Sequence, residues 1–183
     1  SGANIARGGD KNTLYGKSTG YSISTGDSNT NLGWEAGYYN VTGSNNTAVG
    51  SGSMMGVSGQ SNSGNTAVGF NTLKLIRTGD NNVALGSSAG AGITTGGQNI
   101  AIGDNALAGS DTNTGNVIIG YYAGDHASAD VDNAIIIGRA SGRGALTSGA
   151  DGTIIIGWEA GKAITSGAAN TAIGYQSAKH IST

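Results

Sequence analysis

Residues 82–86 read Asn82-Val83-Ala84-Leu85-Gly86, a short strand-like run that closes on a glycine. The pattern recurs along the chain, in half of the ten copies as Asn-x-Ala-(Val/Ile/Leu)-Gly, and we number each coil from its closing glycine as position zero. The ten closing glycines are Gly16, Gly33, Gly50, Gly69, Gly86, Gly103, Gly120, Gly138, Gly157 and Gly174. Their spacing of 17 to 19 residues is too regular for a globular core and too short for helix-containing repeats. We therefore predict a one-dimensional array of thin coils whose function lies on the outer surface.

Composition supports an ordered array. The chain has 35 glycines, but they recur in register, and 37% of its 183 residues are hydrophobic. The absence of proline suits a fold in which almost every residue lies beside a hydrogen-bonded ladder. We expect residues 1–183 to form a single all-β domain, a parallel β-solenoid of about ten 17–19-residue coils. Because the sequence stops in mid-coil at Ser182-Thr183, we also expect it to be an excerpt of a longer fibre.

Several classes of function find no support in the sequence. The net charge is −2, and the nine lysines and arginines are scattered, so there is no basic footprint for nucleic acid. No apolar run approaches the length of a membrane span. The two histidines, His126 and His180, are 54 residues apart, and no triad or metal-ligand spacing is found. We therefore expect no enzyme, no cofactor and no metal. Aspartates just before position −4 are interpreted as turn caps rather than cation ligands: Asp10, Asp27, Asp80, Asp132 and Asp151.

Position −4 carries an asparagine in eight of the ten coils, while Ala134 and Thr153 replace it in the other two. Stacked asparagines are expected to bind backbone groups at a corner and so join one coil to the next. The alternative is that these polar side chains point toward a solvated surface. The predicted structural ladder is Asn12, Asn29, Asn46, Asn65, Asn82, Asn99, Asn116 and Asn170.

The strand residues alternate between two faces. Positions −1 and −3 share one face and position −2 lies on the other. Position −1 is always large, so we expect it to fill the coil, together with a second short strand near position +7 at Ile23, Val57, Ile76, Ile93, Ile164 and Ile181. Position −2 would then face outward although it is apolar, and a parallel strand that is apolar on both faces is covered on both. We interpret position −2 as the seam between chains of a trimer: Ala48, Ala67, Ala84, Ala101, Ile118, Ile136, Ile155 and Ala172.

Turns occupy the remaining positions. Ala-Gly corners such as Ala89-Gly90 and Thr-Gly corners such as Thr78-Gly79 recur between the strands. Glycine supplies the positive φ that a tight corner needs, so we expect a positive φ at both kinds of corner.

Aromatic side chains recur at position +1, directly after the closing glycine. The segment Gly33-Trp34-Glu35-Ala36-Gly37 reappears verbatim at residues 157–161. Exposed rings suit stacking on sugars, and neighbouring carboxylates can bind hydroxyl groups. The alternative is that the rings cover a groove between chains. Together with residues of two lengthened loops, the candidate glycan or receptor contacts are Trp34, Glu35, Phe70, Tyr121, Tyr122, His126, Arg139, Trp158, Glu159 and Tyr175.

Two segments carry a family resemblance. Gly43-Ser44-Asn45-Asn46-Thr47-Ala48-Val49-Gly50 and residues 167–174 resemble the left-handed parallel β-roll repeats of bacteriophage tail-fibre proteins and of trimeric autotransporter adhesin heads. The longer pattern from Thr78 to Gly90 is similar to the phage and marine-viral version. The resemblance implies left-handed coils, a homotrimer, and an extracellular location on a virion tail fibre or a bacterial surface. It also implies attachment to a host cell-surface glycan or protein receptor.

These observations lead to a ranked set of functions. The first is a structural and receptor-attachment segment of a trimeric phage or viral tail fibre. The alternative is the head of a bacterial trimeric adhesin, which would have the same architecture in a different organism. An ice-binding solenoid would need a regular threonine array, yet the threonines of position −3 give way to Val83, Ile100 and Val117. A fibre that cleaves polysaccharides is disfavoured because carboxylates are few.

Overall fold

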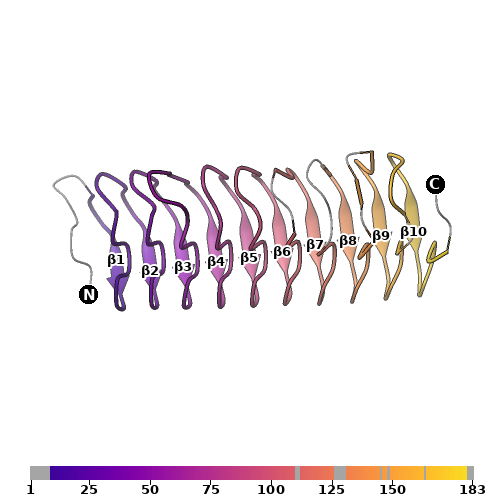
Figure 1. Cartoon of the computed structure of the whole chain (residues 1–183), viewed down its shortest axis with the longest axis horizontal. Helices are drawn as coiled ribbons and strands as arrows, with labels where there is room; N and C mark the ends of the chain where they lie inside the picture. The colour runs from indigo at the N-terminus through magenta and orange to yellow at the C-terminus, as the bar shows by residue number, and fades with distance from the viewer. Residues whose placement is uncertain are drawn as a thin grey trace.

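The computed structural model describes residues 9–109, 112–125, 131–144, 146–147, 149–162 and 164–180. Ten three-residue parallel strands form one sheet in sequence order, and the described residues contain no helix (Figure 1). The first strand, β1, and the last, β10, lie at opposite ends of the row. The strands are β1 Thr13–Tyr15, β2 Thr30–Leu32, β3 Thr47–Val49, β4 Thr66–Val68, β5 Val83–Leu85, β6 Ile100–Ile102, β7 Val117–Ile119, β8 Ile135–Ile137, β9 Ile154–Ile156 and β10 Thr171–Ile173. The prediction of an all-β parallel solenoid is confirmed.

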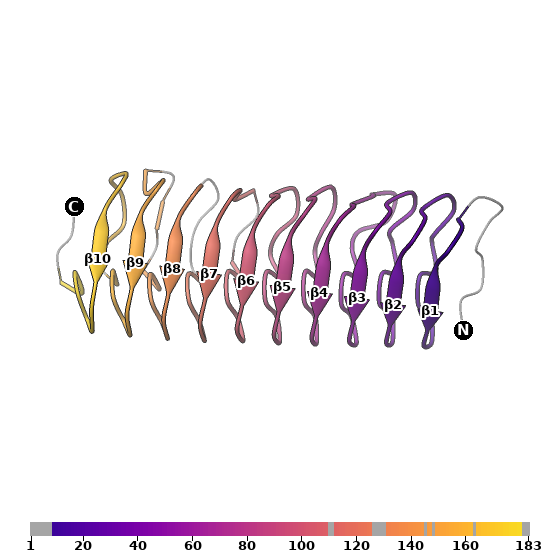
Figure 2. The same ribbon diagram turned by 180° about the vertical axis from the view of Figure 1, so that it is seen from behind.

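Equivalent positions stack on each other from coil to coil. Ala84 of β5 pairs with Ala67 of β4 on one side and with Ala101 of β6 on the other. All strand arrows point to the same edge of the rod, where the tight turns lie, and the longer loops lie at the opposite edge (Figures 1 and 2). Inserted residues therefore leave the strand register unchanged. At the usual spacing between strands, neighbouring coils are about 4.8 Å apart.

The strand faces are the reverse of those predicted. In β5 the central Ala84 is 1% exposed, whereas Val83 and Leu85 are 41% and 48% exposed. Position −2 thus fills the interior of its own coil, and positions −1 and −3 face outward. The predicted trimer seam is therefore wrong for all eight of its residues, each of which is buried within the single chain: Ala48, Ala67, Ala84, Ala101, Ile118, Ile136, Ile155 and Ala172. Alternation shows which positions share a face, but the narrow interior decides that the smaller side chains point inward.

The isoleucines at position −2 match the residues at position +4 of the same coil. A Cβ atom placed on Gly161 would lie 2.7 Å from Cδ1 of Ile155. Where position −2 is alanine, as at Ala101, position +4 is the fully buried Leu107. In most coils a large side chain at one of these positions is therefore matched by a small residue at the other, so that these coils hold a similar volume. The further pairs are Ala48 with Met54, Ala67 with Leu73, Ile118 with Gly124 and Ile136 with Gly142. Ala84 with Gly90 and Ala172 with Ala178 are exceptions.

The coil of Ala84 and Gly90 has two small residues at these positions, and a side chain of the preceding coil occupies the space beside them. A Cβ atom on Gly90 would lie 2.8 Å from Cδ2 of Leu73 in the preceding coil. The interior is therefore matched between coils as well as within them.

This matching predicts a coupled pair of substitutions. Ile155→Ala alone leaves a cavity and should cost about 2–4 kcal/mol in unfolding free energy, and Gly161→Leu alone overpacks the coil. The double variant reproduces the arrangement of Ala101 and Leu107, so we expect it to be more stable than the sum of the single effects by at least about 1 kcal/mol. Urea unfolding of the three variants measures this coupling. Additive losses would show that the two sites do not share one space.

The predicted second strand is not observed. Ile23, Ile76, Ile93 and Ile164 are buried at position +7, but this segment consists of bends and turns rather than a strand. Val57 is only half-buried, and Met54 is buried in its coil instead. Ile181 lies outside the described residues. Neighbouring coils are still joined here, as by the bond from the N–H of Arg77 to the carbonyl oxygen of Thr94 (2.8 Å), but without continuous pairing.

Glycine has two different roles in the corners. At the Ala-Gly corners its φ is positive, as predicted, with +59° at Gly90. At the Thr-Gly corners φ is not positive, so that part of the prediction is wrong: a Cβ atom on Gly79 would collide with the carbonyl oxygen of Gly96 in the next coil. The closing glycines have both a positive φ and no room for a Cβ atom. Gly86 has a φ of +129°, and its Cβ atom would lie 2.7 Å from the carbonyl carbon of Gly103.

A column of buried asparagines runs through the coils at position −4. The backbone N–H of Asn82 donates to Oδ1 of Asn65 (2.8 Å), and its Nδ2 donates to the carbonyl oxygen of Gly96 (3.0 Å). Its own Oδ1 accepts the backbone N–H of Asn99 (3.0 Å). The side chain of each asparagine therefore satisfies buried backbone groups of the following coil, and the asparagine bonds to the side-chain oxygen of its equivalent in the preceding coil.

The column ends where the sequence departs from the pattern. Oδ1 of Asn116 accepts the N–H of Ala134 (2.8 Å), which has no side chain to continue the column. The next position is Thr153, whose buried hydroxyl has no hydrogen-bond partner among the described residues. Buried apolar residues, Val131, Leu146 and Ala150, occur in these coils.

Removal of one asparagine from the column should be costly. Asn82→Ala leaves the N–H of Asn99 and the carbonyl of Gly96 buried without their partners, and each such group costs about 1–3 kcal/mol. We expect the unfolding free energy, measured in urea, to fall by at least about 2 kcal/mol. Thr78→Ala, at an exposed corner, serves as the control and should change it by less than about 0.5 kcal/mol. Equal losses in both variants would contradict a supporting role for the column.

Candidate functional site

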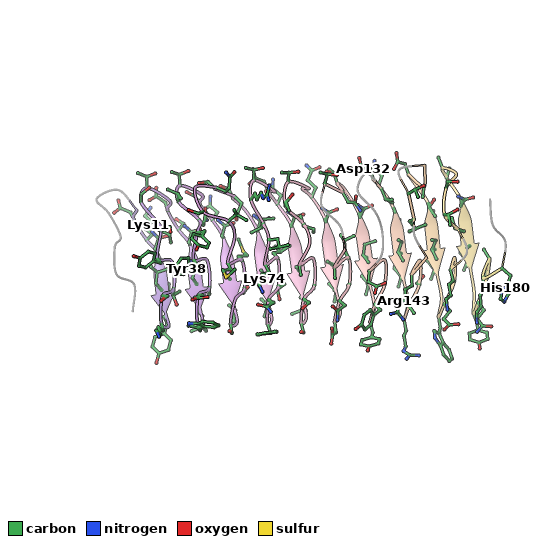
Figure 3. The ribbon with its side chains drawn as sticks, viewed as in Figure 1. Lys11, Tyr38, Lys74, Asp132, Arg143 and His180 are labelled. Atoms are coloured by element: carbon green, nitrogen blue, oxygen red, sulfur yellow. The ribbon has the colours of Figure 1, made fainter. Side chains whose placement is uncertain are left out.

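The turn after each strand presents one side chain per coil to solvent. Position +2 takes a left-handed conformation, with a φ of +52° at Glu159, and position +3 is a buried small residue such as Ala160. Backbone bonds join neighbouring turns, including the one from the N–H of Glu159 to the carbonyl of Arg139 (3.0 Å). Position +1 is thereby held outward at the coil spacing, along the edge where Figure 3 shows the labelled Arg143.

The rings at position +1 are exposed but unevenly distributed. Trp34 and Phe70 are 53% and 56% exposed. They belong to separate coils, and within the described part of the chain neither contacts another ring. Glu35 adjoins Trp34 in the first of these coils. These three predicted contacts are therefore isolated positions on the edge rather than parts of one site.

The last four coils bring the remaining candidates together. The guanidinium carbon of Arg139 lies 5.8 Å from the ring centroid of Tyr121 and 5.6 Å from that of Trp158. Trp158 in turn contacts Tyr175, with 5.2 Å between ring centroids and 55° between ring planes. We call Tyr121, Arg139, Trp158 and Tyr175 the aromatic row. It is a continuous exposed strip formed by four successive turns.

A second layer of side chains adjoins the aromatic row. The rings of Tyr121 and Tyr122 meet edge to face at 4.5 Å. Arg143 lies over Tyr122, 4.6 Å from its ring centroid, and its Nε is 3.5 Å from Oδ1 of Asp125. Asp125 is only 7% exposed, so this carboxylate faces the arginine rather than solvent.

Glu159 is held by two residues of the next coil. Its Oε2 lies 2.8 Å from Nζ of Lys179 and accepts a hydrogen bond from Nε2 of Gln176 (3.1 Å). The hydrogen bond from Lys179 is the main reason that the pKa of Glu159 is lowered, and the charges of Lys179 and Lys162 act in the same direction. The carboxylate is therefore ionised at neutral pH and fixed beside Trp158.

Sequence reasoning anticipated most of this cluster but not all of it. The structure brings together Tyr121, Tyr122, Arg139, Trp158, Glu159 and Tyr175, while His126 lies outside the described residues. Lys179 was missed because a single lysine carries no signal by itself. It would have been found by aligning position +2 of one coil with position +5 of the next.

A second ring group, also missed, lies near the N-terminal end. Tyr21 and Tyr38 are stacked with centroids 5.0 Å apart, and Tyr39 meets Tyr38 edge to face at 4.5 Å. Partial burial is the main cause that raises the pKa of Tyr38, followed by the nearby Tyr39, Tyr21 and Glu35. Figure 3 labels Tyr38 on this part of the rod.

The recurring aspartates bind backbone groups of the preceding coil. Oδ1 of Asp27 accepts the N–H of Asp10 (2.6 Å), and Oδ1 of Asp132 accepts the N–H of Thr114 (2.7 Å). Asp80 and Asp151 accept the N–H groups of Ser63 and Asp132 in the same way. These carboxylates therefore link successive coils instead of capping their own turns, so the predicted capping role is wrong for them. No cluster of three or more potential metal ligands occurs among the described residues.

Comparisons with protein-family models, with curated proteins and with solved structures give no match. No pocket is found among the described residues. They also include no helix of the length and apolarity that a membrane crossing requires.

The contact between Glu159 and Lys179 can be tested by titration. Lys179→Met removes the main cause of the lowered pKa, so we expect the carboxyl pKa of Glu159, followed by NMR, to rise toward its ordinary value. Because the folded-state pKa is lowered, the contact stabilises the fold above the ordinary glutamate pKa and is lost as pH falls through the folded value. Lys162→Met is the control and should cause a smaller rise. A larger rise in the control would contradict the assigned geometry.

Proposed function

We propose that this chain is a structural and receptor-attachment segment of a homotrimeric fibre of a phage or virus, which binds or spaces contacts to host cell-surface glycans. The observation that carries the proposal is the apolar outer face of the sheet. Position −1 presents Leu32, Val49, Val68, Leu85, Ile102, Ile119, Ile137, Ile156 and Ile173 on this face, and from β5 to β9 position −3 adds Val83, Ile100, Val117, Ile135 and Ile154.

A face of this kind favours association with another surface. Leu85 and Ile173 are 48% and 63% exposed in the single chain. Monomeric proteins rarely leave a long continuous apolar strip in water, and parallel sheets are ordinarily covered on both faces. A second copy of the chain offers a strip of the same length and period, so copies of this rod are the partners that we propose. Three copies follow from the β-roll resemblance.

The edge turns support the attachment role. The aromatic row lies beside the outer face rather than on it, so its rings stay accessible when that face is covered. Exposed aromatic side chains outside any pocket suit contact with an extended sugar chain, whose rings can stack on them. An extracellular location belongs to this proposal.

The alternative remains the head domain of a bacterial trimeric adhesin, which would use the same surfaces. An ice-binding solenoid is less favoured. Outward threonines occupy position −3 at Thr13, Thr30, Thr47 and Thr66, but they share the face with Leu32 and Val49 and are replaced by aliphatic residues from β5 to β9.

The assembly can be tested by light scattering on the purified chain. We expect the mass of a trimer, and we expect Leu85→Lys with Ile102→Lys to give folded monomers because charges would be buried at the proposed interface. Thr78→Lys, at an exposed corner away from the face, should leave the trimer intact. A well-folded monomer of the unaltered chain would refute the proposed assembly.

A further inference from the structure

Arg139 is an exposed cation without a carboxylate partner among the described residues. It lies between the rings of Tyr121 and Trp158, within 6 Å of both centroids. Ring contacts use the face of a guanidinium group and leave its N–H donors at the edge available. Two parallel N–H donors match the geometry of a carboxylate, so Arg139 is suited to bind an anionic ligand.

The charges around the aromatic row also favour an anionic ligand. Both carboxylates of the cluster are already engaged, since Asp125 faces Arg143 and Glu159 contacts Lys179. Lys162 forms no ion pair within the described part of the chain, so the outward charges left on these four turns are positive. This local excess contrasts with the net charge of −2 of the whole chain. The exposed Asp104 lies on the turn before Tyr121, two coils from Arg139, and is bonded to Asn105.

The spacing of the row indicates an extended ligand. Tyr121, Arg139, Trp158 and Tyr175 place one planar group on each of four successive turns, about 4.8 Å apart along the rod. That spacing is close to the length of one pyranose unit in an extended polysaccharide. Successive sugars of a single chain can therefore meet successive coils.

We infer that the aromatic row binds an anionic sugar chain lying along the rod axis. Sugar rings stack on Tyr121, Trp158 and Tyr175, and Arg139 binds the acidic group of one sugar. This inference rests on the proposed attachment function and specifies its ligand class.

Calorimetric titration of the full chain with oligogalacturonates, and with the same oligomers after carboxyl reduction, tests the inference. We expect the reduced oligomers to bind about tenfold more weakly, which corresponds to one lost charge-assisted hydrogen-bond pair. Arg139→Gln should weaken binding of the acidic oligomer about tenfold and leave binding of the reduced oligomer unchanged. Trp158→Ala should weaken both. Arg77→Gln, at an exposed arginine of another coil, is the matched control and should change neither.

Other outcomes separate this inference from the proposed function. Equal affinity for acidic and reduced oligomers would refute the anionic ligand but support glycan attachment. An equal effect of Arg77→Gln and Arg139→Gln, or tight binding of dextran sulfate unaffected by Trp158→Ala, would show unspecific charge attraction and refute the site. No binding to these oligomers or to a broad glycan array would overturn both the inference and the glycan part of the proposed function.

Discussion

The close stacking of one backbone on the next is the constraint on which the rest of this rod depends. A coil of 17 to 19 residues is too thin to enclose a core of its own, so its backbone groups bond to neighbouring coils, as in the bonds from Gly86 to Val68 and from Gly103 to Leu85. The small distance between neighbouring backbones excludes a side chain at each internal closing glycine. It also explains why the Thr-Gly corners need glycine without needing a positive φ.

The same stacking explains how the interior tolerates different sequences. A large side chain at position −2 is paired with a small one at position +4, or the reverse. The coil of Ala101 and Leu107 and the coil of Ile155 and Gly161 therefore have similar cross-sections. The buried polar column can also give way to apolar residues. Asparagines run through the first seven coils, whereas apolar side chains are buried near Ala134 and Ala150. The outer surface is consequently free to vary.

The period predicted the architecture because stacking makes equivalent positions recur at equal intervals. The buried asparagines were also predictable, since an amide repeated in register has few other uses in such a fold. Which strand face is buried was not predictable. Alternation assigns residues to two faces without saying which one points inward, and both Ala84 and Leu85 are apolar. The contact between Glu159 and Lys179 joins two coils, so neither residue signals it alone. Tyr121, Arg139 and Trp158 were each predicted as surface contacts, but the position of Arg139 between the two rings was not, because it depends on side-chain conformations in three different coils.

The end of the asparagine column has a mechanical meaning. In a rod pulled along its axis, every junction between coils bears the same force, so the junction with the fewest cross-links yields first. The amide of Asn116 still bonds the coil of Ala134, but the junction from the coil of Ala134 to that of Thr153 has no side-chain amide of this kind. Under tension, the described part of this junction is therefore held by bonds such as the one from the N–H of Gly157 to the carbonyl oxygen of Ile137, without the side-chain amides that reinforce the N-terminal coils.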